Sequence, residues 1–299
     1  MEASAEIVEN YFNLQSRDET RLTSNPPHMG GPFAGDRVYG GLTVSQAVNA
    51  FTTLYPDSIP HTVNYKFIAP ATVDVPFTYT VTRHDGIASV SATQDGKTMG
   101  MGHIRYTTTT TDYLDSPSVI CPEYIADPED YPNTDQLAAI IREKENTPLR
   151  EELVYSLEEH GKTAIEIRPV ETPAFPKSDI DRTTLWMRIK PEFQDQLQEK
   201  DGLNIVGFLS DFATPNVVVE IYSKAKIEFS NAASLHHSLW LHDSAFDPRD
   251  FYLTVMECPV ISHGRARVVS HMFNSKRKCV MSIVQECYVQ RVQTRTNKI

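Results

Sequence analysis

The chain has 299 residues, of which 40% are hydrophobic, and a formal net charge of −11 at pH 7. This size allows one large or two ordinary domains with a substantial core. The acidic balance argues against nucleic acid or an anionic membrane surface as the main partner. We expect no membrane span, because the sequence lacks an apolar run of that length. The four cysteines lack CxxC spacing, which indicates reduced thiols in an intracellular protein.

An N-terminal domain is predicted over residues 1–111, with its ordered part beginning near Phe33. The segment GGLTVSQAVNAFTTLY has apolar residues at helical spacing and ends before Pro56. Four segments rich in β-branched and aromatic residues follow it, and two of the turns between them contain Asp-Gly. The pattern predicts one central helix followed by antiparallel strands.

Residues 112–182 have a different composition, with many prolines and acidic residues. Within them, TDQLAAIIREKEN predicts a short helix and TAIEIRPVE predicts a strand. We interpret this region as a connector that contributes part of a second sheet.

Residues 183–299 repeat the order of the first domain. The segment GLNIVGFLSDFA predicts a helix whose pattern breaks at Pro215, and four strand-like segments follow. Such a repeat, at a spacing of roughly 170–180 residues, indicates an internal duplication. The expected fold is α+β, with two antiparallel sheets that each wrap around a long helix.

The segment ASLHHSLWLH reads as a strand with three histidines. Successive side chains of a strand point to opposite faces. Ser234 and His236 are therefore expected on one face, and His237 on the other among leucines. Because His236 and His237 point apart, we expect no metal site here.

Motifs of several enzyme classes are missing from the sequence: GxSxG, GxxxxGK[ST] and HExxH. Two polar residues in apolar surroundings are better candidates. Asp211 lies in the predicted apolar helix, and Gln285 interrupts the apolar face of the last strand. A buried carboxylate is costly unless it is hydrogen-bonded. Asp211 is either a surface residue of an amphipathic helix or a functional group that meets Gln285 between helix and sheet.

A series of segments in the same order resembles the type II acyl-CoA thioesterases, whose fold is a double hotdog. RVYGGLTVSQAV is similar to that family's RVFGGQVxxQAL, and ASLHHSLWLH is similar to ATIDHSMWFH. PHTVNYKFIAP, ATQDGK, IEIRPVE, LWMRI, FLSDF and SIVQECYV also have counterparts. The resemblance runs from about Arg37 to Arg291 and covers most of the chain.

The resemblance implies that a bound water hydrolyses an acyl-CoA to a free acid and CoA. The family's water-binding Asp, Ser or Thr, and Gln match Asp211, Ser234 and Gln285. We expect no cofactor, because CoA is part of the substrate. Further candidates for the substrate pocket are His61, Gly40, Gly41, Gln46 and His236. His61 is equally well explained as a hydrogen-bonded histidine at the start of a strand.

The chain also departs from the family. The hairpin DGIASVSATQ is shorter than the family's and lacks two arginines, so the thiol carrier or the acyl group is expected to be specialised. One alternative is a double-hotdog hydratase or dehydratase, which the sequence disfavours because Asn216 stands five residues after Asp211. Another alternative is a non-catalytic acyl-thioester binding protein. A homo-oligomer is possible, although one chain already supplies the usual pair of hotdog units.

The expected location is peroxisomal or cytoplasmic. The chain ends in Asn-Lys-Ile, which shares its lysine with the peroxisomal tripeptide Ser-Lys-Leu. Asn297 and Ile299 depart from that signal.

Overall fold

In the first half of the chain a buried helix precedes four antiparallel strands, as predicted. The computed structural model describes residues 10–31, 34–109, 118–143, 148–170 and 182–292. The helix is α2 (Gly40–Leu54), and the strands are β5 (Ile59–Phe67), β6 (Thr78–His84), β7 (Ile87–Gln94) and β8 (Lys97–Thr107). Gly86 and Gly96 have φ values of 68° and 74° in the two Asp-Gly turns. These turns need glycine because few other residues adopt positive φ without strain.

Four strands that the sequence did not predict precede α2. They are β1 (Leu14–Ser16), β2 (Arg21–Ser24), β3 (Gly30–Gly31) and β4 (Ala34–Val38). β1 and β2 extend the sheet beyond β6, whereas β3 and β4 pair with each other in a small second sheet. Strands of two to five residues are too short to show a clear alternation.

The connector contains two helices and a strand: α3 (Thr134–Arg142), α4 (Pro148–Gly161) and β9 (Ile165–Pro169). The predicted helix and strand are α3 and β9. Asn133 caps α3 by accepting a hydrogen bond from the backbone of Gln136. α4 was not predicted, although Val154 and Leu157 are spaced as on one helical face and are buried.

The second half repeats the arrangement with an interrupted helix. Its elements are β10 (Arg182–Ile189), α5 (Gly202–Leu209), α6 (Thr214–Lys224), β11 (Phe229–Leu241), β12 (Tyr252–Ser262), β13 (Arg265–Phe273) and β14 (Cys279–Arg291). Short 3-10 helices span Pro128–Asp130, Pro191–Gln196 and Glu199–Asp201.

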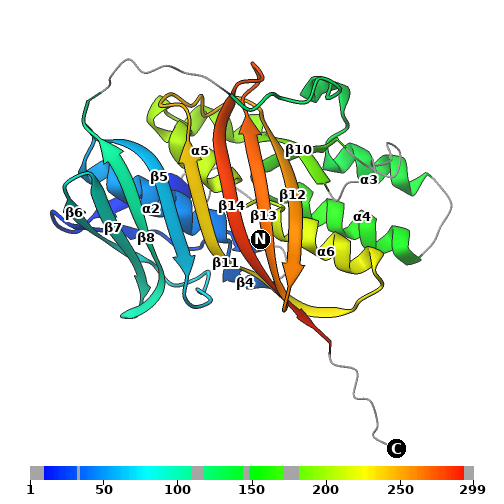
Figure 1. The fold of residues 1–299 in the computed structure, drawn as a ribbon, viewed down its shortest axis with the longest axis horizontal. Helices are drawn as coiled ribbons and strands as arrows, with labels where there is room; N and C mark the ends of the chain where they lie inside the picture. The colour runs from blue at the N-terminus through cyan, green and yellow to red at the C-terminus, as the bar shows by residue number, and fades with distance from the viewer. Residues whose placement is uncertain (1–9, 32–33, 110–117, 144–147, 171–181, 293–299) are drawn as a thin grey trace, which may run out of the picture.

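The predicted pair of sheets is joined into one continuous sheet of twelve strands (Figure 1). The strand order is β1-β2-β6-β7-β8-β5-β11-β14-β13-β12-β10-β9. The order β5-β8-β7-β6 in one half corresponds to β11-β14-β13-β12 in the other, which agrees with the predicted duplication. β5 and β11 pair antiparallel at the junction, for example His237 with Tyr65. The fold is an α+β double hotdog, as expected.

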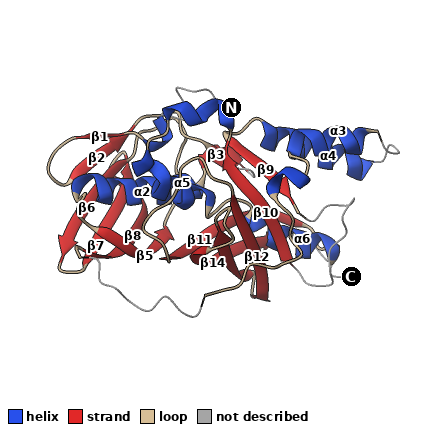
Figure 2. Cartoon of the chain, turned by 90° about the horizontal axis from the view of Figure 1, so that it is seen from above, coloured by secondary structure: helices blue, strands red, loops and turns tan. Residues whose placement is uncertain are grey.

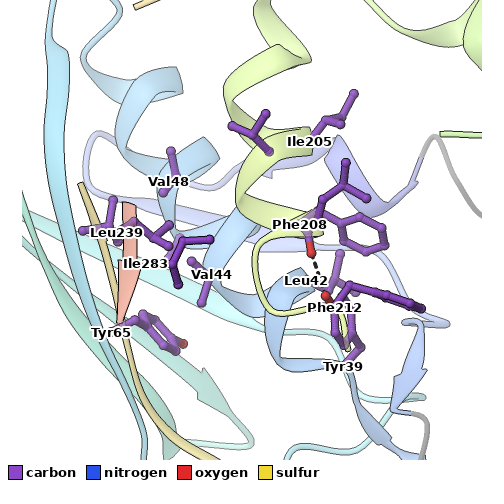
Figure 3. Close-up of a cluster of buried hydrophobic side chains, with 14 of the residues drawn as sticks. Tyr39, Leu42, Val44, Val48, Tyr65, Ile205, Phe208, Phe212, Leu239 and Ile283 are labelled. Carbon is purple, nitrogen blue, oxygen red and sulfur yellow. Dashed lines mark hydrogen bonds between the residues drawn. The ribbon is translucent and has the colours of Figure 1, made fainter. Parts of the chain in front are cut away.

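The central helices of the two halves lie side by side on one face of the sheet (Figure 2). The Ser45 hydroxyl of α2 donates to the Asn204 carbonyl of α5 at 2.7 Å, and the Tyr39 hydroxyl donates to the Phe208 carbonyl at 2.7 Å. Apolar side chains from both helices and from β11 and β14 fill the space between helices and sheet (Figure 3). The two halves therefore share one hydrophobic core.

The predicted helix over residues 202–213 is wrong at its end. α5 stops at Leu209, and α6 begins at Thr214. Ala213 has a φ of 61°, a left-handed conformation that cannot continue a helix. Asp211 therefore lies in the turn between two helices rather than inside one.

None of the helices in the described ranges is long and apolar enough to cross a membrane. The C-terminal Asn-Lys-Ile, on which the peroxisomal expectation depended, lies outside the described residues.

Candidate active site

A cavity of about 430 Å³ lies where the two halves meet. The first half contributes the start of α2 and the end of β5, and the second half contributes the α5–α6 turn and the start of β11. The lining is largely apolar and includes Phe67, Ile68, Met99, Phe212 and Leu235. Its polar members include Arg37, Tyr39, His160, Asp211 and Ser234. An apolar cavity with a few polar groups at an interface between structural units is typical of a small-molecule site.

The three predicted catalytic side chains meet at the carboxylate of Asp211, which accepts hydrogen bonds from the other two. The Ser234 hydroxyl donates to Asp211 Oδ1 at 3.1 Å, and Gln285 Nε2 donates to the same oxygen at 2.5 Å. Gln285 Nε2 also lies 2.5 Å from Ser234 Oγ. The three residues come from the α5–α6 turn, β11 and β14, so the fold of the second half brings them together.

The first residues of α2 also lie against the carboxylate of Asp211. The backbone N–H of Gly41 donates to Asp211. A Cβ atom built on Gly40 would lie 2.5 Å from Asp211 Oδ2. Gly40 therefore needs to be glycine to let the carboxylate approach the helix. The positive end of the α2 dipole and its N–H groups favour a negative charge at this position.

The environment of Asp211 perturbs its ionisation. Only 4% of the residue is exposed, and burial raises the pKa of its carboxyl to about 6. The hydrogen bonds from Gln285, Ser234 and Gly41 lower the pKa and partly oppose this effect. A carboxylate with a pKa near 6 is ionised at neutral pH and still accepts a proton readily.

The predicted faces of β11 require a correction. Ser234 pairs with Cys287 and His236 pairs with Glu286, so Leu235 is an extra residue that forms a β-bulge. The bulge reverses the alternation. Ser234 and His237 therefore share the inner face with Gln285. His236 is on the outer face, where its Nε2 lies 3.2 Å from Ser238 Oγ.

The remaining candidates for the substrate pocket differ in whether they lie at the cavity. Gly40 lines the cavity, and Gly41 contacts Asp211 through its backbone. Gln46 is buried in the core, where it accepts a hydrogen bond from the Tyr79 hydroxyl. His61 is exposed on β5 and hydrogen-bonds with Thr107. Gln46, His61 and His236 are not among the cavity-lining residues.

Several cavity residues were not predicted from the sequence. Tyr39 and Arg37 lie within the quoted segment RVYGGLTVSQAV, and Phe212 follows Asp211 directly. His160 comes from α4, and its ring packs edge-on against Phe212 with the ring centroids 5.7 Å apart. Nothing in the sequence indicates that a histidine of the connector reaches this cavity.

Comparison with known proteins identifies the family. A family model described as the acyl-CoA thioesterase C-terminal domain matches residues 128–289, and the model of the N-terminal domain matches residues 30–109. The chain belongs to the acyl-CoA thioesterase family. The solved structures that superpose on the thioesterase share little of its sequence.

Two solved structures illustrate the relationship. The acyl-CoA thioesterase II TesB2 from Mycobacterium marinum superposes with a TM-score of 0.70 at 16% identity, covering 96% of this chain and 99% of the other. A TesB protein from Mycobacterium avium subspecies paratuberculosis gives a TM-score of 0.67 at 18% identity, with 96% and 99% coverage. A search of curated protein sequences found no match to the thioesterase.

A dehydratase domain of a mycocerosic acid synthase-like polyketide synthase is more distant. Its TM-score is 0.53 at 10% identity, with 92% of this chain and 93% of the other covered. The fold is shared with dehydratases, but the family models are those of thioesterases, and the two TesB structures superpose more closely than this dehydratase.

Proposed function

We propose that the thioesterase hydrolyses acyl-CoA thioesters with a water molecule that Asp211 activates. The convergence of Ser234 and Gln285 on one oxygen of a buried carboxylate supports this proposal most directly. These two donors hold Asp211 in one orientation, and Asp211 lines the cavity in which an acyl group would bind.

Each of these groups has one role in the proposed reaction. Asp211 takes a proton from the water, while the hydroxyl of Ser234 and the amide of Gln285 orient its oxygen. The water oxygen forms a bond to the thioester carbonyl carbon, and the backbone N–H groups at the start of α2 stabilise the resulting oxyanion. The C–S bond then breaks, and the thiolate of CoA leaves and takes up the proton. No covalent acyl-enzyme and no further cofactor are needed.

The apolar lining indicates which part of the substrate enters the cavity. Phe67, Met99 and Phe212 form an acyl pocket, and burying an apolar chain there is favourable in proportion to its area. Arg37 is exposed and also lines the cavity, so it can attract the phosphates of CoA. Because the β6–β7 hairpin lacks two arginines of the family pattern, Arg37 would be a replacement source of positive charge for those phosphates.

A histidine in the cavity is relevant to the hydratase alternative. His160 lines the same cavity as Asp211, and an Asp/His pair is the acid–base set that the alternative requires. However, Nδ1 of His160 donates to the Ser156 carbonyl at 2.7 Å and its ring packs on Phe212. These contacts indicate that His160 forms part of the cavity wall and is not an acid that faces Asp211.

Incubation of the purified protein with saturated and 2-enoyl CoA thioesters of several chain lengths distinguishes the three functions. We expect one free thiol and one carboxylic acid for each thioester consumed. Hydration of the enoyl substrates without thiol release would establish the alternative enzyme class. Binding of acyl-CoA with neither reaction would establish a binding protein.

A further inference from the structure

His237 lies directly behind the proposed water-binding residues. It is fully buried on the inner face of β11, and its register partner on β14 is Gln285. Nε2 of His237 lies 2.8 Å from the Ser210 hydroxyl, in the turn that also carries Asp211. The imidazole thus stands between Ser210 and Gln285.

Two buried polar atoms of this pair lack a hydrogen-bond partner within normal geometry: Nδ1 of His237 and Oε1 of Gln285. Buried polar atoms without a partner are rare and costly. Burial lowers the pKa of His237 to about 4, and hydrogen bonding with the Gln285 side chain opposes this effect in part. His237 and Gln285 are register partners on adjacent strands, so a hydrogen bond between the two unpaired atoms would satisfy both of them.

The tautomer of His237 follows from the acceptors around it. At neutral pH the ring is uncharged and carries one N–H. If that proton were on Nε2, Nδ1 would carry no hydrogen. Nδ1 of His237 and Oε1 of Gln285 would then both be acceptors, and neither could pair with the other. If the proton is on Nδ1, it can donate to Gln285, while Nε2 accepts from the Ser210 hydroxyl. Ser210 then gives up its alternative acceptor, the Gly207 carbonyl 2.7 Å away.

We propose that His237 is a positioning residue, whose Nδ1–H donates to Oε1 of Gln285 and so fixes the orientation of the Gln285 amide. The inference rests on the proposed function, because the other end of that amide orients the water and Asp211. With Oε1 held by His237, Nε2 must face Asp211 and Ser234. A flipped amide would instead put its oxygen against the Asp211 carboxylate, which only accepts hydrogen bonds when ionised.

The test is a double-mutant cycle on kcat with His237→Leu and Gln285→Leu. We expect His237→Leu to lower kcat by about 10- to 100-fold with KM nearly unchanged, because the amide is no longer held in place. In the Gln285→Leu background the same substitution should change kcat by less than about twofold. The acid limb of the pH profile should also move to higher pH in His237→Leu, because Asp211 loses a well-oriented donor.

Further variants separate positioning from packing. His237→Gln restores an N–H donor and should recover most of the activity. His28→Leu is the matched control, since His28 is also buried, lies 3.2 Å from a serine hydroxyl and has its pKa lowered to about 4 by burial. This control should lose thermal stability without the change in kcat or in the acid limb. If His237→Leu does not fold, Ser210→Ala takes its place in the cycle.

The outcomes distinguish this inference from the proposed function. A wild-type protein that releases no thiol from any thioester would overturn the proposed function. An active wild type in which the effects of His237→Leu and Gln285→Leu simply multiply would overturn the role of His237 alone.

Discussion

The carboxylate of Asp211, in the second half of the chain, accepts a hydrogen bond from the backbone N–H of Gly41, in the first half. Helix α2 has no side-chain cap of its own, because its N-cap residue is Tyr39. Asp211 therefore satisfies one of the donors at the helix start, and the helix stabilises the carboxylate. The site depends on contact between the halves, and we expect neither half to be active alone.

Replacing Asp211 with asparagine should stabilise the fold at neutral pH. The folded-state pKa of about 6 is above the ordinary value of 3.8, so the wild type loses stability as pH rises between these values. The difference corresponds to about 3 kcal/mol as an upper estimate. Asp211→Asn should therefore have the higher unfolding free energy at pH 7.5, as measured by urea denaturation, and no advantage near pH 3.5. An advantage of equal size at both pH values would contradict the shifted pKa.

Removing the Ser234 hydroxyl should change the pH dependence of catalysis. This hydroxyl donates to Asp211 and lowers its pKa, so Ser234→Ala should raise the pKa above 6. The acid limb of kcat/KM should move to higher pH in this variant, whereas Ser234→Thr should retain the wild-type limb. Ser230→Ala is the control on the same strand, because Ser230 is exposed and bonds only weakly to the Gln290 carbonyl at 3.4 Å. An unchanged acid limb of kcat/KM in Ser234→Ala would show that the Ser234 hydroxyl does not influence the catalytic carboxylate.

A methyl group at Gly40 should disturb the site. Its Cβ would lie 2.5 Å from Asp211 Oδ2 and 3.0 Å from the Phe67 ring, so Gly40→Ala must displace the carboxylate. We expect a fall in kcat of about 100-fold, because small displacements of a reacting group are costly. Gly207→Ala, in α5, is the matched control, since its Cβ would make an ordinary contact at 3.6 Å. Equal activity in both variants would show that the approach of Asp211 to α2 is not required.

Replacing Arg37 tests whether CoA is the thiol carrier. Arg37→Ala should raise KM for acyl-CoA several-fold and leave KM unchanged for a thioester of the same acyl group with a short, uncharged thiol, because only CoA has phosphates. Arg105→Ala, an exposed arginine of β8 outside the cavity, is the control. An equal effect of Arg37→Ala on both substrates would mean that this arginine does not recognise the phosphates.

The sequence was most informative where a pattern repeats over many residues. Helix α2 and the four strands that follow it have clear periodicity and diagnostic Asp-Gly turns, and the same order recurs in the second half. Asp211 and Gln285 could be singled out because each is a polar residue in an apolar run. That contrast reflects the cost of burying a polar group.

The rest depended on features with no local signal. The bulge at Leu235 put Ser234 and His237 on one face, and an extra residue in a strand is visible only in its pairing. The helix break before Thr214 depends on Ala213, a residue that ordinarily favours helix. His160 reaches the cavity through the packing of α4, which tertiary contacts determine.

The central claim is that Asp211 activates the water that cleaves the thioester. Its most direct test is the single-turnover rate of acyl-CoA hydrolysis between pH 4.5 and 8 in the wild type and in Asp211→Asn, with enzyme in excess. We predict that the wild-type rate follows one ionisation near pH 6, and that the variant is slower by about 10²- to 10⁴-fold and insensitive to pH. A variant that hydrolyses at the wild-type rate, or that keeps the same ionisation, would contradict the account.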